Sequence, residues 1–140
     1  MSARQAVFSR MREAFESTGV WRLMSKEIKA ADYTRPGDPL KIDCGYSRND
    51  SVKLFHALAL PGDPNSAKLL AFTLPQLAEG IRRKDGKIAQ LTAVVADDLP
   101  LDEASVSFAL ETLERQSIAI SPLAQMAAIA GQAAKEMGLA

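Results

Sequence analysis

Residues 88–95 constrain the fold of this chain more than any other stretch, because they are almost continuously apolar. The run ends at Val95, and two aspartates and Pro100 follow it. A nearly continuous apolar strand is typical of a sheet that is covered on both faces. The sequence therefore predicts an α/β fold with helices on both sides of a mainly parallel sheet.

Strand and helix patterns alternate on either side of this run. Residues 40–46 alternate between apolar and polar positions, and after a turn at 47–50 a more apolar strand covers 52–60. Two strands this close predict an antiparallel hairpin. The other expected elements are a helix that begins at Pro64 and is kinked or split by Pro75, a helix at 101–115, a short strand at 117–120 and a last helix opened by Pro122.

Two amphipathic helical patterns, at 3–18 and 20–28, precede these elements, and a turn-rich segment at 33–39 follows them. We predict a helical N-terminal arm at residues 1–34 and an α/β domain at residues 35–140. The domain is expected to have three layers around a mixed, mainly parallel sheet of about four strands, with the antiparallel hairpin at its N-terminal end.

Composition excludes several classes of function for the 140-residue chain. Basic and acidic side chains number 17 each, so there is no global field for nucleic acid or anionic membrane, and nucleic acid is left unsupported but open. Cys44 is the single cysteine, which excludes a disulfide framework or a thiol cluster and suits a reducing compartment. No stretch approaches the roughly 20 apolar residues of a membrane span, so we expect a cytoplasmic protein. Phosphate-binding and nucleophile-elbow motifs are absent, and no cofactor is predicted.

The hairpin carries the sharpest catalytic hypothesis. If Tyr46 pairs with Val52, Asp43 lies diagonal to Lys53, and such a pair is typical of metal-dependent nucleases of the PD-(D/E)XK type. In those enzymes carboxylates hold magnesium and the lysine polarises water or phosphate. Ser51 occupies the place of the second carboxylate, and that fold has three consecutive antiparallel strands where two are predicted. The alternative is a solvated cross-strand pair.

Cys44 and His56 are the only thiol and the only imidazole. In the same register they share a face and lie diagonal to each other, whereas a shift of one residue puts them on opposite faces. A nucleophilic pair needs a third group to orient the imidazole. The alternative is a buried thiol and a hydrogen-bonded core histidine.

Asp97 and Asp98 follow the apolar strand, where the carboxyl ends of strands line the ligand crevice of an open α/β sheet. They are candidates for a metal or an acid–base site, and the alternative is a polar turn beside a helix N-terminus. No other metal site is predicted. The basic cluster at 82–84 fits phosphate or, more simply, the negative end of the helix dipole.

Phe8, Phe15 and Trp21 are the candidate binding residues. A helical arm with exposed aromatic side chains is a common docking element, although such an arm usually packs on its own domain. A protein partner is therefore expected. The alanine-rich last helix is compatible with close helix packing, and so with a homo-oligomer.

Three short segments, at 41–46, 55–58 and 91–95, resemble uncharacterised bacterial and prophage-type proteins of unknown function. The resemblance covers residues 37–138 and implies mobile-element biology, with no activity or site residues. The sequence thus predicts a non-enzymatic protein-interaction or regulatory module. The alternative is a nuclease-like or degenerate nuclease domain that uses Asp43 and Lys53, with His56 as a further catalytic candidate.

Overall fold

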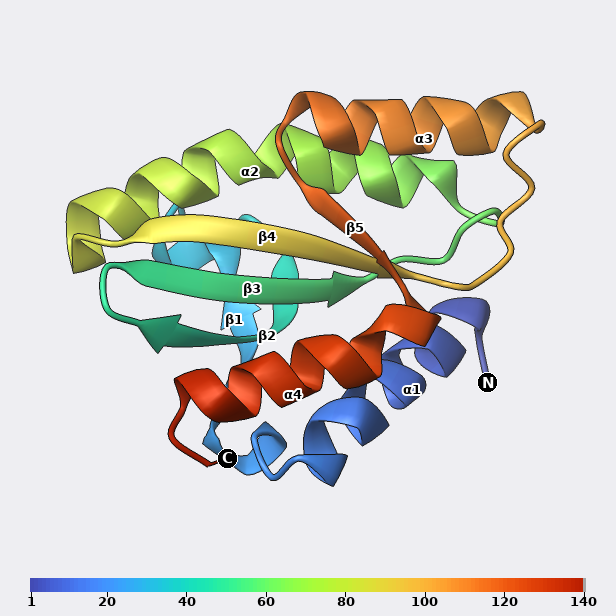
Figure 1. Ribbon diagram of the computed structural model, residues 1–140. Helices are drawn as coiled ribbons and strands as arrows, with labels where there is room; N and C mark the ends of the chain where they lie inside the picture. The colour runs from blue at the N-terminus through green and yellow to red at the C-terminus, as the bar shows by residue number, and fades with distance from the viewer. Residues whose placement is uncertain (140) are drawn as a thin grey trace.

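The computed structural model describes residues 1–139 and contains a mixed sheet of five strands (Figure 1). In their order across the sheet these are β1 (Ser25–Lys29), β2 (Lys41–Arg48), β3 (Ser51–Ala57), β4 (Ile88–Val95) and β5 (Ala119–Pro122). The first three strands pair antiparallel and the last three pair parallel. The predicted α/β class and the antiparallel N-terminal hairpin are confirmed.

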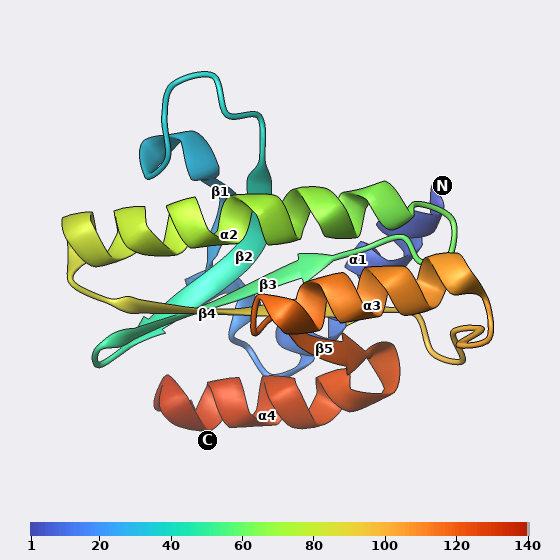
Figure 2. The ribbon, with the colours of Figure 1, turned by 90° about the horizontal axis from the view of Figure 1, so that it is seen from above.

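Helices lie on both sides of this sheet (Figures 1 and 2). α2 (Pro64–Asp85) and α3 (Ala104–Arg115) cover one face with a largely aliphatic core, whereas α1 (Ala3–Ser17) and α4 (Met126–Glu136) cover the other. The α1/α4 core holds the aromatic rings of Phe15, Tyr46 and Phe55. Within residues 1–139, no helix has both the length and the apolar character that crossing a membrane requires.

α1 belongs to the core of the domain. The Ser2 hydroxyl and the Gln5 side chain form a capping box at its start, which satisfies backbone N–H groups that the helix leaves free. Val7, Met11 and Phe15 on its inner face are buried against the sheet. Residues 1–34, predicted as an arm, therefore supply both a covering helix and a strand of the sheet.

The prediction of a helix at 20–28 is wrong. This segment contains β1, which is the fifth strand of the sheet. A short 3₁₀ turn, η1 (Trp21–Leu23), leads directly into β1. Ile28 pairs with Ile42 of β2 and packs on the α2/α3 side, while Met24 is buried on the α1/α4 side. Pairing with β2 outweighs the local helical spacing, because it satisfies the backbone and buries both faces.

The predicted hairpin register is wrong, and so is one of the two outcomes predicted at Pro75, the splitting of the helix. The Asn49–Asp50 turn sets a register in which Arg48 pairs with Ser51, so Tyr46 lies opposite Lys53 and not opposite Val52. α2 is not split at Pro75 and runs unbroken from Pro64 to Asp85. Leu74 and Leu77, on either side of the proline, are buried in the same core and hold the helix against the sheet.

Candidate functional site

Asp43 lies at a fork where β2 and β3 separate. The two strands pair from their turn as far as Cys44 and Phe55, and Figure 2 shows them diverging beyond it. Asp43 Oδ2 accepts a hydrogen bond from the Ala57 N–H (2.8 Å), and the Asp43 N–H donates to His56 Nδ1 (3.3 Å). A carboxylate and an imidazole thus satisfy two backbone donors at the end of the ladder.

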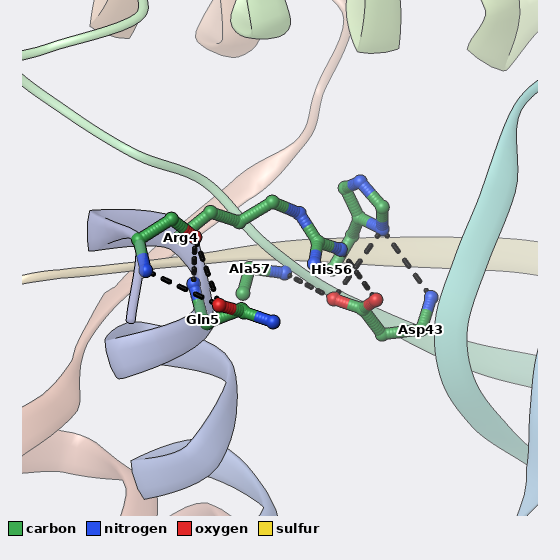
Figure 3. Close-up of polar contacts among 6 residues, drawn as sticks. Arg4, Gln5, Asp43, His56 and Ala57 are labelled. Atoms are coloured by element: carbon green, nitrogen blue, oxygen red, sulfur yellow. Dashed lines mark hydrogen bonds and ion pairs between the residues drawn. The ribbon is translucent and has the colours of Figure 1, made fainter.

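Arg4 ties α1 to this fork. Figure 3 shows its guanidinium reaching from the first turn of α1 to Asp43, where Nη2 and Oδ1 form a hydrogen-bonded ion pair. The Asp43 side chain is 10% exposed and that of Arg4 is 40% exposed. Both oxygens of Asp43 therefore already have partners, one from a helix and one from a strand.

His56 is held neutral beside this ion pair. Burial lowers the pKa of His56 below its ordinary value of 6.5; the Asp43 carboxylate opposes that shift, and Arg4 adds to it. Because Nδ1 accepts from the backbone, the ring proton lies on Nε2. In this state the imidazole is a structural acceptor at the fork.

A cleft of about 530 Å³ opens beside Arg4, between α1, η1 and β1. We call it the α1 cleft, and its lining residues are Arg4, Gln5, Phe8, Arg12, Trp21, Lys26, Glu27 and Asp43. Trp21 meets Phe8 edge-on, with 6.0 Å between the ring centroids. Arg12 Cζ lies 5.2 Å and Lys26 Nζ 5.3 Å from the centroid of Trp21, which are cation–π distances. The cleft thus holds cations beside an aromatic wall and suits a ligand with negative charge and an apolar group.

A second buried carboxylate, Glu136, lies at the far end of the hairpin, with its side chain 1% exposed. Lys53 Nζ donates to both of its oxygens (2.7 and 2.9 Å), Tyr46 Oη and Gln132 Nε2 lie at 3.3 and 3.1 Å, and Arg48 Nη1 lies at 3.5 Å. Burial raises the pKa of Glu136, but the hydrogen bonds from Lys53, Gln132 and Tyr46 together lower it below its ordinary value. Burial and the nearby Glu136 raise the pKa of Tyr46 to about 12. This cluster fixes α4 to the hairpin.

The predicted pair of Asp43 and Lys53 is not formed. The register places Lys53 opposite Tyr46, three residues along β2 from Asp43, and each side chain has a different ionic partner. Asp43 binds Arg4 at the fork, whereas Lys53 binds Glu136. The one-residue error in the expected register is the physical reason, because each such shift turns side chains to the other face.

Cys44 and His56 are likewise kept apart. Cys44 pairs with Phe55, and its side chain is fully buried in the α1/α4 core. His56 follows Phe55 on β3, so its side chain points to the opposite face of the sheet from Cys44. Burial raises the pKa of the Cys44 thiol far above its ordinary range, and the Asp43 charge adds to this. A nucleophilic thiol–imidazole pair is therefore not assembled, and the core alternative agrees with the geometry.

Asp97 and Asp98 form a turn after β4. Asp97 Oδ1 accepts a hydrogen bond from the Ala124 N–H (2.9 Å) at the 3₁₀ turn η3 (Leu123–Gln125), and Asp98 has a positive φ of 56°. Across residues 1–139, no three or more His, Cys, Asp or Glu side chains gather in a way that could hold a metal ion. Asp97 thus caps the turn before α4.

The basic cluster at the end of α2 also has a structural role. Arg83 and Lys84 donate to the main-chain oxygens of Tyr33 and Asp32 (3.4 and 2.7 Å). These bonds fasten the 3₁₀ turn η2 (Ala30–Asp32), which precedes a loop that projects beyond the sheet in Figure 2.

The structure separates the three predicted binding aromatics. Phe8 and Trp21 are partly buried and line the α1 cleft. Phe15 is fully buried and packs edge-on against Phe55 at 5.1 Å, so it contacts no partner from outside. Its place among binding residues is therefore corrected: Phe15 is a core residue.

Four charged residues of these sites are not among the predicted site residues, namely Arg4, Arg12, Lys26 and Glu136. The helical spacing carried a signal for two of them: Arg4 precedes the buried Val7 by three positions, and Glu136 follows the buried Ala133 by three. Residues with that spacing share a helix face, so both side chains could have been placed beside the sheet. Lys26 had no such signal, because its segment was assigned to a helix.

The chain matches no protein-family model, and no curated protein and no solved structure matches it significantly. A function must therefore be inferred from its own residues.

Proposed function

We propose that this chain is a non-enzymatic binding module that docks an acidic segment of a protein partner in the α1 cleft. One observation carries the proposal: the chain's single tryptophan, Trp21, lies in the cleft with Arg12 and Lys26 at cation–π distance. Cations held on an aromatic ring lose less freedom when they meet an anion than free side chains do. Phe8 supplies an apolar wall beside them.

The composition of the cleft favours a peptide over nucleic acid. Affinity for nucleic acid comes from neutralising several phosphates at once. The cleft contains Glu27 and Asp43 besides its three cations, and Asp43 already takes up Arg4. Arg12 also forms an exposed ion pair with Glu16 (Nε–Oε1 3.4 Å), which a ligand carboxylate can replace at little cost. Arg12 and Lys26 are thus the two cations for a ligand, which matches one or two carboxylates next to an apolar side chain.

Trp21 is a built-in reporter for the test. Acidic peptides that contain one aromatic residue would be titrated while Trp21 fluorescence is followed, with a single-stranded DNA oligonucleotide as the second ligand class. Arg12→Gln and Lys26→Gln should each weaken peptide binding by about three- to ten-fold. The matched controls Arg10→Gln and Lys29→Gln, exposed on the same helix and strand, should leave it unchanged. Equal losses in test and control variants, or tighter binding of the oligonucleotide, would refute the peptide proposal.

The second candidate is a nuclease-like domain, or its degenerate descendant, and the observation that favours it is the strand order. Three consecutive antiparallel strands precede α2 and the parallel β4, as that fold requires, and Asp43 lies on the second of them. The side chains favour the degenerate form, because Ser51 offers no carboxylate and Lys53 is bound to Glu136. A manganese titration followed by amide NMR separates the two candidates. Selective broadening of signals around Asp43 would support the nuclease-like domain. The absence of selective broadening at millimolar manganese would refute it and favour the binding module.

The setting of the module is part of the proposal. We take the chain as a three-layer cytoplasmic domain in phage-related or mobile-element regulation, in line with the sequence resemblance. Self-association is the further prediction, although Ala130, Ala133 and Ala134 of α4 are already used by its own core. Fractionation of cells that express the tagged chain checks the compartment, and sedimentation velocity checks the oligomer.

A further inference from the structure

A second cleft, of about 540 Å³, opens on the face of the sheet that α1 and α4 cover. It lies between α4 and the first halves of β3 and β4. We call it the α4 cleft. Cross-strand neighbours form its floor, since Lys53 lies beside Gln90 and Phe55 beside Thr92. Its volume lies within the roughly 300–1,000 Å³ of small-molecule sites. The binding module proposed above does not use it.

The charge of the α4 cleft is set by one residue. Lys53 is the one charged side chain among the eleven described residues that line it. Behind the cleft, Lys53 and Arg48 share the single carboxylate of Glu136, so the cluster has one positive charge in excess. An ammonium has three N–H donors, and Glu136 accepts two bonds from Lys53. With the side chain 31% exposed, one donor remains for a ligand.

The rest of the lining is apolar with a polar rim. Phe55 and Ile129 give an aromatic and an aliphatic surface, while Gln90, Thr92 and Gln132 carry hydrogen-bonding groups. Ligand sites typically combine such apolar walls with a few placed polar groups. A positive charge at one end and an apolar floor call for a molecule that is negative at one end and apolar along its body.

We propose that the α4 cleft binds a small organic carboxylate, with the carboxylate on Lys53 Nζ and the apolar body against Phe55 and Ile129. The excess charge of the cluster selects an anion, and the floor selects a hydrocarbon body. A neutral alcohol of the same shape can accept a hydrogen bond from Lys53 but brings no negative charge, so it should bind less tightly.

Naphthalene acetate is a suitable probe, and its neutral analogue naphthalene methanol is the charge control. Titration of the full chain should shift the amide NMR signals of Gln90, Thr92 and Ile129, and the acid should bind about ten-fold more tightly than the alcohol. Equal affinities for acid and alcohol, or the absence of shifts at these amides at millimolar probe, would overturn the proposal.

Variants test the same point without depending on one substitution. Lys53→Met should abolish the preference for the acid, whereas Lys135→Met, exposed on α4 outside the lining, should keep it. Because Lys53→Met also strips Glu136 of its main partner, Ala119→Phe is the second variant. Ala119 is exposed in the lining, so the phenyl ring fills the cleft and should block the probe in a folded protein. Unchanged probe binding in folded Ala119→Phe would place the site elsewhere.

Discussion

Two buried carboxylates, Asp43 and Glu136, fasten the helices of one face to the two ends of the same hairpin, and they do so differently. Glu136 is 1% exposed and is neutralised by cations from the strands on both sides of the turn. Asp43 is 10% exposed and is neutralised by a single cation, Arg4, that comes from a helix and is itself 40% exposed. The carboxylate of Glu136 is almost completely closed off from solvent, whereas that of Asp43 keeps some exposure.

The difference in exposure changes the cost of breaking each ion pair. Removing a partner from an enclosed charge leaves it unsolvated, so the Glu136 cluster has to stay intact for α4 to stay docked. Arg4 can be hydrated, so opening its bond with Asp43 has a modest cost. The Asp43 pair is therefore easier to open than the Glu136 cluster, although one cation of each lines a cleft.

The largest effect is expected from Lys53→Met. The substitution leaves Glu136 with one cation, the half-exposed Arg48 at 3.5 Å, and breaking a buried pair in this way costs about 3 kcal/mol of unfolding free energy. Urea denaturation measures it, with Lys135→Met as the control of equal charge change. A loss no greater than that of the control would mean that the Glu136 cluster is no more enclosed than the Asp43 pair.

Asp43→Asn should cost less, about 1–2 kcal/mol. The amide oxygen keeps an acceptor for the Ala57 N–H, so what is lost is the charge that faces Arg4. The same denaturation experiment gives the number. A larger loss than in Lys53→Met would reverse the comparison between the two ends.

Acid should weaken the two ends in sequence. The folded pKa of His56 lies below 6.5, so its contribution is present above pH 6.5 and is lost as the pH falls toward the folded value. The folded pKa of Glu136 lies below its ordinary 4.5, so its contribution is present above pH 4.5 and is lost as the pH falls further through the folded value.

As the pH falls, the protection of amides from exchange, corrected for the intrinsic pH dependence of the exchange rate, should therefore decrease at a higher pH in α1 than in α4. In His56→Gln the loss of unfolding free energy between about pH 7 and pH 5 should shrink, because the unfolded chain no longer takes up that proton. If α4 loosens first, the assignment of the two ends is wrong.

The smallest effect belongs to the two outer cations, Arg4 and Arg48. Their side chains are 40% and 48% exposed, so Arg4→Gln and Arg48→Gln should each cost about 0.5–1 kcal/mol. Because the two act at opposite ends of the hairpin, the double variant should be additive within about 0.5 kcal/mol. A coupling well above that value would show that the ends are not independent.

The elements predicted correctly are those with strong local patterns. β4 has a nearly unbroken apolar run, and the hairpin and α2 have regular spacing with turn or cap residues at their ends. β1 was missed because Val20, Met24 and Ile28 also fit a helix, and only β2, far along the chain, selects the strand. The spacing of apolar residues within the segment does not determine whether it forms a helix or a strand.

The site was less predictable, because its contacts join distant parts of the chain. Trp21 and Phe8 could be named as binding aromatics, but Arg4 meets Asp43 across 39 positions and Lys53 meets Glu136 across 83. The register depended on the position of the turn, which was predicted at 47–50, whereas β2 continues to Arg48 and pairs there with Ser51. Asn49, with a positive φ of 53°, makes the two-residue turn and so moves Lys53 away from Asp43.

The two edge strands of the sheet, β1 and β5, determine whether a strand of another chain can be added to it. In β1 the pairing with β2 skips Glu27, which has a positive φ of 47°, and Lys26 and Lys29 flank it. A kinked, lysine-rich edge discourages the addition of a foreign strand. β5 ends at Pro122, which has no N–H to offer a neighbour. Growth of the sheet from copy to copy is therefore resisted at both sides, so a partner of the proposed module would have to contact side chains.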